Sequence, residues 1–199
     1  IRNLCLSATV FENLKDSPTQ LITHSVACGV GMRALAEIGP ISVMLESPEE
    51  AFILGLIHDI GKTIFASYLP AEFAETVVLA QRESLTSHQA EQKIIGLDHA
   101  ELGAHLARHW KLGDMLINVI AGHHDLTRCD EPFLPLAASL TIADYIAGKC
   151  GFAAQEKPVY EIPPEVWTAA GMDGKTIADV IDRFIADVPK MDELIALAS

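Results

Sequence analysis

Helical periodicity runs along nearly the whole chain and constrains its fold more than any other feature. Apolar residues recur about every three to four positions, whereas the strict alternation that marks β-strands is almost absent. Gly39-Pro40 closes a predicted helix at Thr19–Ile38, and the segment 47–50 is a capping box with proline at the first helical position. The chain is therefore predicted to be all-α, a compact bundle of about ten helices.

The other predicted helices follow from the same periodicity and from turn residues. They cover residues 1–14, 48–58, 64–68, 70–84, 86–94, 113–122, 132–149, 165–170, 175–187 and 190–198. The 199 residues, half of them apolar, can bury one sizeable core. We expect residues 1–150 to form the main metal-binding domain. Residues 151–199, beyond a segment rich in Gly, Pro and charge, are expected to form a helical extension packed on the same core.

A further helix is predicted to begin just after Asp98. Asp98 and Glu101 form an aspartate version of the capping box. This start places His99 in an exposed first turn. The helical period then predicts a buried face made of Leu102, Leu106 and Trp110.

Charge and composition exclude several classes of partner. The formal charge of −13 argues against binding to nucleic-acid duplexes or membrane surfaces, because both require clustered Lys and Arg. The apolar stretches fall short of the ~20 residues of a membrane span, and we expect a cytoplasmic protein. The four cysteines form no C-x-x-C pair, so reduced thiols are expected. Because the first residue is Ile, we expect a portion of a longer chain.

The segment 55–62 is the strongest functional signal. An apolar helix ends there on His58-Asp59, and Gly61 and Lys62 follow at once. An imidazole and a carboxylate at a helix end can turn toward one divalent cation, with the carboxylate able to bridge a second, and Lys62 can face an anionic phosphate. The alternative is an ordinary helix C-terminus in which His58 and Lys62 only complement the helix dipole.

Other candidate ligands lie on the predicted helices. His24 has small and apolar neighbours that point it inward, although a lone inward histidine is more often a hydrogen-bonded core residue. His99 begins a helix, and His123-His124 ends one. Asp144 lies in an otherwise apolar segment, where an unpaired carboxylate costs several kcal/mol, and a metal would supply the partner it needs.

The order H…HD…H…HH…D along an all-helical chain resembles the HD superfamily of metal-dependent phosphohydrolases. The local sequence is more similar still to the HDOD family of bacterial signalling domains, from Ile1 to about Gly148. The resemblance implies that the opening helices of such a module precede this chain. It is carried by Gly55-Leu56-Ile57-His58-Asp59-Ile60-Gly61-Lys62, Gly96-Leu97-Asp98-His99-Ala100-Glu101-Leu102-Gly103, Trp110-Lys111-Leu112 and His123-His124.

The resemblance implies a ligand set for each of two divalent metals. The first metal would be bound by His24, His58, Asp59 and Asp144. The second, present in the branch that includes the HD-GYP cyclic-dinucleotide phosphodiesterases, would be bound by His99, His123 and His124, with Asp59 bridging. Many HDOD domains have lost part of this set and are regarded as non-catalytic, whereas this sequence keeps all seven residues.

Two differences from the HD-GYP pattern limit what is implied. No Gly-Tyr-Pro segment follows His123-His124, so cyclic dinucleotides are expected to be poor substrates. Gln20 stands where some relatives place a glutamate for a third metal, which sets the expected maximum at two metals. Surface or packing roles are predicted for His88, His105 and His109, and Trp110 and Trp167 are predicted to be core or interface anchors.

Three functions remain open on the sequence. The first is a metal-dependent phosphohydrolase or phosphodiesterase for a small phosphate ester or nucleotide, with Fe or Mn as the expected metal and Zn, Ni or Mg as alternatives. In it, Asp59 would orient the attacking hydroxide and Lys62 would stabilise charge on the phosphate. The second is a non-catalytic signalling scaffold that binds partner signalling domains, its metal site being structural or sensory. In the third, the histidines are structural and no metal is bound.

Overall fold

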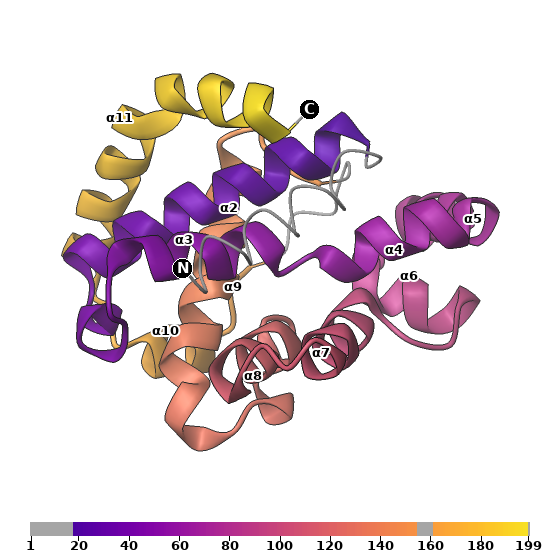
Figure 1. Ribbon diagram of the computed structural model, residues 1–199, viewed down its shortest axis with the longest axis horizontal. Helices are drawn as coiled ribbons and strands as arrows, with labels where there is room; N and C mark the ends of the chain where they lie inside the picture. The colour runs from indigo at the N-terminus through magenta and orange to yellow at the C-terminus, as the bar shows by residue number, and fades with distance from the viewer. Residues whose placement is uncertain (1–17, 155–160, 199) are drawn as a thin grey trace.

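The computed structural model describes residues 18–154 and 161–198, and every regular element in these ranges is helical (Figure 1). The predicted all-α fold is therefore confirmed, while the helix predicted at 1–14 lies outside the described residues. In chain order the elements are α2 (Thr19–Ile38), η1 (Pro40–Met44), α3 (Pro48–Ile57), α4 (Ile60–Tyr68), α5 (Pro70–Glu83), α6 (Ser87–Ile94), α7 (His99–His109), α8 (Asp114–Gly122), η2 (Leu126–Arg128), η3 (Glu131–Phe133), α9 (Leu134–Lys149), α10 (Pro164–Ala170) and α11 (Gly174–Ala198).

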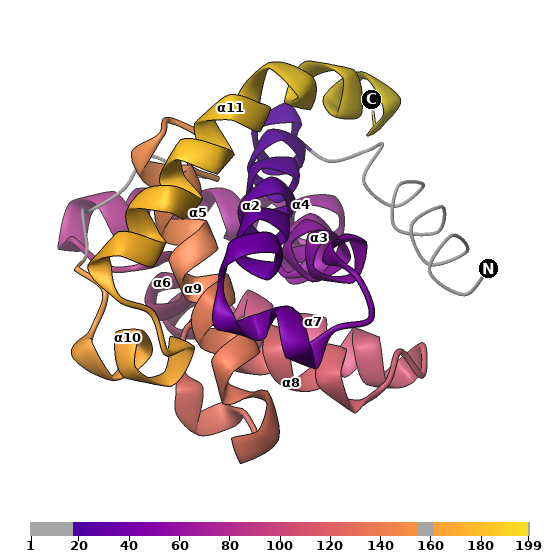
Figure 2. The same cartoon turned by 90° about the vertical axis from the view of Figure 1, so that its left-hand side faces the viewer.

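Helix α2 is the centre of the molecule and packs against α3, α9 and α11 (Figure 2). Fourteen of its twenty residues are buried. The backbones of α2 and α3 are in contact where the two helices cross. A Cβ added at Gly55 on α3 would collide there with the carbonyl oxygen of Cys28 on α2. The main core joins α2, α3, α8 and α9 to α10 and α11, whose Val166, Val180 and Phe184 are buried in it.

A second close crossing joins α4 to α7. A Cβ at Gly61 would collide with the carbonyl of His99, and one at Gly103 would lie 3.0 Å from Cγ2 of Ile120 on α8. Helices α4, α7 and α8 therefore meet through small residues, and this close approach brings the start of α7 next to the turn between α3 and α4.

The predicted buried face of α7 is wrong. Its buried residues are His99, Ala100, Gly103, Ala104 and Ala107, whereas Trp110 is 37% exposed. The close crossings of α7 with α4 and with α8 select the small residues as the inner face, and the larger Leu102 and Leu106 lie at its margins, half-buried. His99 is consequently buried and does not lie in an exposed turn, and Trp110 is not a core anchor.

One predicted cap and two predicted boundaries also differ, since α4 begins at Ile60 and not at residue 64. Ser47 makes no side-chain cap at α3, and Glu50 instead accepts a hydrogen bond from the backbone nitrogen of Glu46 at 2.9 Å. Residues 174–198 form one helix with Pro189 inside it, not two short helices. Proline removes one backbone donor and its ring crowds the carbonyl one turn earlier, so other contacts must hold the helix together here. An ion pair of 2.7 Å between Asp187 and Lys190 spans the interruption, and buried Phe184 and Met191 hold the helix on both sides of it.

Among the described residues, no single helix is long and apolar enough to cross a membrane. Only Pro48–Tyr68 and Pro70–Glu83, taken together across a bend of 119°, reach the length and composition of a span. The first of these segments carries buried core residues such as Leu54 and Phe65.

Candidate metal centre

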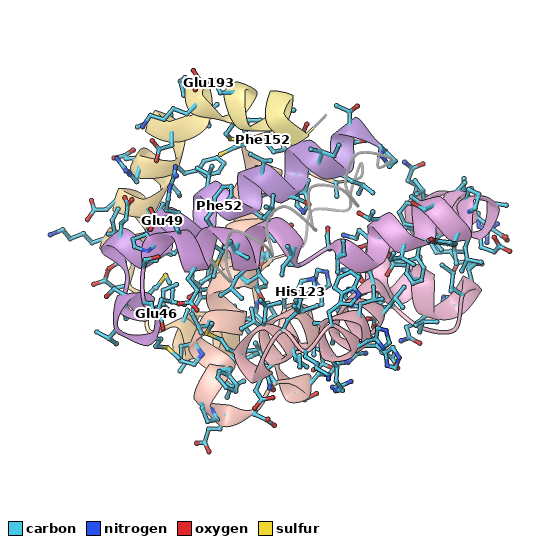
Figure 3. The ribbon with its side chains drawn as sticks, viewed as in Figure 1. Glu46, Glu49, Phe52, His123, Phe152 and Glu193 are labelled. Atoms are coloured by element: carbon cyan, nitrogen blue, oxygen red, sulfur yellow. The ribbon has the colours of Figure 1, made fainter. Side chains whose placement is uncertain are left out.

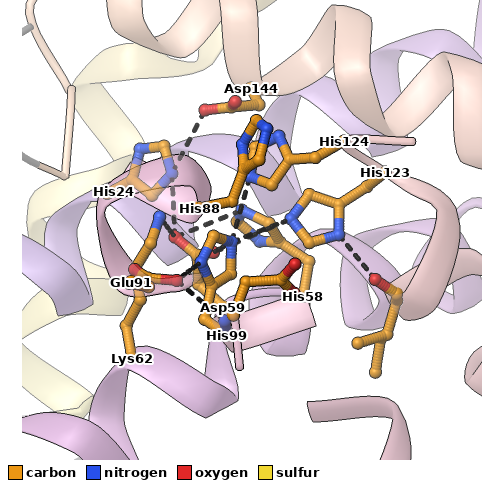
Figure 4. Close-up of polar contacts among 12 residues, drawn as sticks. His24, His58, Asp59, Lys62, His88, Glu91, His99, His123, His124 and Asp144 are labelled. Carbon is orange, nitrogen blue, oxygen red and sulfur yellow. Dashed lines mark hydrogen bonds and ion pairs between the residues drawn. The ribbon is translucent and has the colours of Figure 1, made fainter. Parts of the chain in front are cut away.

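The seven predicted ligands converge in the interior from five helices or helix ends (Figure 4). In the wider view His123 lies deep between the helices, whereas Glu46, Glu49 and Glu193 lie at the periphery (Figure 3). The donor atoms fall into two clusters, each with its atoms within 4.8 Å of one another. One contains His24, Cys28, His58 and Asp144, and the other contains Asp59, His99, His123 and His124.

The turn between α3 and α4 places Asp59 between the two clusters. Helix α3 ends at Ile57, and Asp59 (φ −95°, ψ 17°) leaves the helix before α4 starts at Ile60. Asp59 Oδ2 lies 3.4 Å from His24 Nε2, and Oδ1 lies 3.1 Å from His99 Nε2. One carboxylate thus faces a histidine of each cluster.

Three histidines have their ring orientation set by backbone carbonyl groups. A carbonyl can only accept, so in each pair the ring Nδ1 must donate, and Nε2 is left to face the cluster. The pairs are His24 with Phe152 at 2.7 Å, His58 with Gly55 at 2.7 Å and His123 with Ile120 at 2.6 Å. Such a bond from the second ring nitrogen is the usual companion of a metal-ligating histidine.

His99 is oriented by the carboxylate of Glu91, which is not among the predicted site residues. Glu91 on α6 is fully buried, and its Oε2 accepts hydrogen bonds from His99 Nδ1 at 2.6 Å and from His99 backbone nitrogen at 2.8 Å. Burial by itself lowers the pKa of His99, but the carboxylates of Glu91 and Asp59 together outweigh this and raise that pKa to about 9. A glutamate that the helical period places on an inner face of α6 was the only available signal.

The protonation states differ among the residues of the site. Burial lowers the pKa of His58 to about 4 and the pKa of His123 and His124 well below the usual value, so these three imidazoles are neutral. Burial also opposes ionisation of Asp59, yet its electrostatic interactions with His58, Lys62 and His99 hold its pKa well below the usual range. These three imidazoles and Asp59 thus have the protonation states that metal binding requires, whereas His24 and His99, whose pKa values are raised, must lose a proton when a metal binds.

Several donor atoms approach one another closely. His99 Nε2 lies 3.3 Å from His123 Nε2, 3.0 Å from His124 Nε2 and 3.1 Å from Asp59 Oδ1. In the first cluster, His24 Nε2 lies 3.3 Å from Asp144 Oδ1. Imidazole nitrogens and carboxylate oxygens in this arrangement fit a divalent transition metal in either cluster.

Two further residues at the site were not assigned to it from the sequence. Cys28 lies one turn after His24 on α2, with Sγ 3.6 Å from His24 Nε2, and its spacing of four residues was the available signal. His88 stacks on His124 with ring centroids 4.7 Å apart, a packing role in keeping with the prediction. His105 and His109 are exposed on α7.

Lys62 is more deeply placed than a free surface cation. It is only 5% exposed, and its ammonium group donates to Asp59 Oδ2 at 2.7 Å. Burial lowers its pKa, but the charges of Asp59, Glu91 and Asp144 together outweigh this and raise the pKa above its usual value. Lys62 is therefore charged, and part of its charge is already matched by Asp59.

A cavity of about 430 Å³ opens beside the two clusters. Its inner wall includes His24, Lys62, His123, His124 and Asp144. Its outer wall comes from the segment before α6, from the start of η2, and from α10 with the residues that precede it, including Thr86, Leu126, Glu161 and Glu165. The C-terminal part of the chain thus helps to shape the space in front of the candidate metal centre.

These features define a class: an all-helical domain in which histidines and aspartates from helix ends and from inner faces of helices form a buried double cluster. The HDOD domain model matches residues 1–126, and the chain belongs to the HDOD family.

Relatives of known sequence match only parts of this chain and smaller parts of themselves. An uncharacterized protein of Treponema pallidum is 26% identical over 154 residues, which are 77% of this chain and 29% of that protein. Ribonuclease Y of Listeria monocytogenes serotype 1/2a is 31% identical over 125 residues, 55% of this chain and 23% of that protein. The chain therefore spans less than a third of the length of these curated relatives.

Solved structures share the fold. An HDOD domain protein of unknown function from Geobacter sulfurreducens has a TM-score of 0.74 at 21% identity, covering 96% of this chain and 66% of that chain. A protein from Shewanella amazonensis provisionally described as a phosphohydrolase has a TM-score of 0.67 at 22% identity, with coverages of 91% and 64%. The MmoQ response regulator from Methylococcus capsulatus has a TM-score of 0.58 at 21% identity, with coverages of 84% and 62%.

Proposed function

We propose that this chain is an HDOD signalling domain with metal-dependent phosphohydrolase or phosphodiesterase activity. The observation that carries the proposal is the convergence of two donor clusters on either side of Asp59, beside an open cavity. A purely structural histidine cluster needs no such access to solvent.

One or two divalent metals would be held by the two clusters. The first would use His24, His58 and Asp144, the second would use His99, His123 and His124, and Asp59 would contribute to both. A bound divalent ion would supply a Lewis acid for a phosphoryl oxygen and lower the pKa of water. Iron and manganese suit a set of imidazoles and carboxylates.

The chain's own groups would orient the reactants. The buried Asp59 carboxylate, which lies between the two clusters, would orient the attacking water. The Lys62 ammonium, which lines the cavity, would stabilise charge that develops on the phosphate oxygens.

The charges around the cavity support a small substrate with one phosphate. Among the described residues that line it, Lys62 is the only lysine or arginine, whereas Asp125, Glu161 and Glu165 add negative charge. A second phosphate would therefore lie near carboxylates with no cation to match it. Small phosphate esters and mononucleotides therefore fit the cavity better than cyclic dinucleotides do. They also fit it better than RNA, the substrate named in the relative ribonuclease Y.

The structure of Lys62 favours a second candidate function. Lys62 already forms an ion pair with Asp59 inside the protein, and this pair balances both charges without a bound phosphate. In this case the chain is a non-catalytic scaffold, its metal centre fixes the helices, and its surface binds partner signalling domains.

Metal analysis and an assay on the same samples test the proposal. Protein purified without chelator should contain one to two equivalents of transition metal and hydrolyse an aryl phosphodiester or a mononucleotide with added iron or manganese. Asp59→Ala should lose both metals, His99→Ala mainly the second, and the exposed His105→Ala neither. Lys62→Ala should lower turnover more than metal content. Metal without turnover above the Asp59→Ala background would support the scaffold, and absence of metal after reconstitution would contradict both functions.

A further inference from the structure

Cys28 lies among the donor atoms of the first cluster. It follows His24 by one helical turn on α2, so both side chains are on the same face, and Cys28 is fully buried. Its Sγ and one donor atom each of His24, His58 and Asp144 all lie within 4.8 Å of one another. The thiol is therefore part of a four-residue group.

The spacing of these atoms matches tetrahedral coordination. With metal–sulfur and metal–nitrogen bonds of about 2.3 and 2.1 Å, tetrahedral angles place sulfur and nitrogen about 3.6 Å apart, and nitrogen and oxygen about 3.4 Å apart. The observed distances from His24 Nε2 are 3.6 Å to Cys28 Sγ and 3.3 Å to Asp144 Oδ1. The group would need little rearrangement to hold an ion.

The partners of the two Asp59 oxygens favour an additional anionic ligand in the first cluster. Asp59 Oδ2 accepts a short hydrogen bond from Lys62 at 2.7 Å, which reduces its capacity to neutralise a metal in the first cluster. Asp59 Oδ1 faces His99 in the second cluster. Because Lys62 already balances the charge of Asp59, a thiolate at Cys28 would supply the negative charge that a metal in the first cluster still needs.

We propose that Cys28 Sγ is a ligand of the metal in the first cluster, together with His24, His58 and Asp144, and that Asp59, engaged by Lys62, is a weaker fifth ligand of the same ion. Thiolate is a soft ligand, so this site prefers Zn²⁺, Fe²⁺ or Co²⁺ over Mg²⁺. The second cluster contains nitrogen and oxygen donors only. This inference rests on the metal centre of the proposed function but not on its catalytic activity.

A core cysteine is the competing explanation, because buried thiols often act as small apolar residues. Such a thiol fills space, and serine at the same position would leave metal binding unchanged. The two explanations therefore differ in spectroscopy and metal selectivity, neither of which depends on turnover.

Cobalt titration distinguishes them. The full chain, stripped of metal, is titrated with Co²⁺ as wild type, as Cys28→Ser and as Cys150→Ser, the last changing an exposed thiol. Wild type and Cys150→Ser should show a near-ultraviolet sulfur-to-cobalt charge-transfer band, and Cys28→Ser should lack it. The Zn²⁺ affinity of Cys28→Ser should fall by more than about tenfold. A loss of that size is already typical when a residue that only hydrogen-bonds to a metal ligand is removed, and a direct ligand should cost more.

Three results of the cobalt titration would contradict the Cys28 ligand. Cobalt binding without the band in wild type, or a band that persists in Cys28→Ser, would overturn the thiolate ligand while leaving the metal centre of the proposed function intact. No cobalt uptake by wild type would overturn both. Because Cys28→Ser could unfold, wild type alone is also tested by competition: a site that takes Mg²⁺ as readily as Zn²⁺ contradicts a thiolate ligand.

Discussion

Glu91 binds His99 twice, through the ring Nδ1 at 2.6 Å and the backbone nitrogen at 2.8 Å. The two residues lie on different helices, and both are completely buried. A carboxylate in this position fixes the direction of the imidazole and increases its basicity. The second cluster therefore depends on α6, which contributes no donor atom to either cluster.

Replacing Glu91 should weaken the second cluster selectively. Glu91→Gln removes one of the charges that hold the pKa of His99 at about 9, so this pKa should fall in the metal-free protein. Affinity for the second metal should drop by about 10- to 100-fold. NMR titration of the histidines and a metal-binding isotherm measure the two effects. Glu49→Gln, an exposed glutamate at the periphery, is the control, and an equal loss in both variants would refute the role of Glu91.

Lys62→Ala should destabilise the metal-free protein much more than the metal-bound protein. Without Lys62 the buried Asp59 carboxylate loses its ion pair, which costs roughly 3 kcal/mol of unfolding free energy. A bound divalent ion restores the missing positive charge and should recover much of this loss. Urea unfolding with and without metal measures the difference. Lys93→Ala removes an exposed ion pair and should have little effect in either state.

Gly61→Ala should separate α4 from α7. The added Cβ would collide with the His99 carbonyl, which belongs to the backbone and cannot rotate away. We expect a loss of about 1 to 3 kcal/mol in unfolding free energy and weaker metal binding at the second cluster. Gly174→Ala is the matched control, since its Cβ meets nothing within 4 Å. If thermal unfolding and metal affinity are the same in the two variants, the close crossing does not position His99.

Asp187 should make stability depend on pH. Its hydrogen bond from Lys190, with Arg183 and Arg33 nearby, holds its pKa below the usual value. The carboxylate therefore contributes stability that is fully present above the unfolded pKa of about 3.9 and is lost as the pH falls through the lowered folded pKa. Asp187→Asn should be less stable than wild type at pH 7, and the gap should narrow below about pH 4. Denaturant titrations across this range measure it, and a gap that widens in acid would contradict the assignment.

Local sequence determined the secondary structure and much of the donor set. Helical periodicity and caps act over a few residues, which is why Thr19–Ile38 and the Asp98 cap, with its 2.9 Å bond from Glu101, were predicted correctly. The pair His58-Asp59 carries its chemistry in adjacent residues, so it too could be recognised from the chain alone.

Tertiary structure decided which side chains are buried and which donors meet. Small residues on α7 turned His99 inward because α4 and α8 approach closely there, a contact that periodicity cannot reveal. Glu91 and Cys28 join the clusters only because α6 and α2 pack against helices distant in the sequence. Pro189 predicted a break, yet contacts on both sides of it keep α11 continuous. The sequence alone therefore determined which groups are available, and the packing of helices decided their partners, because burial and charge pairing arise between residues that are far apart along the chain.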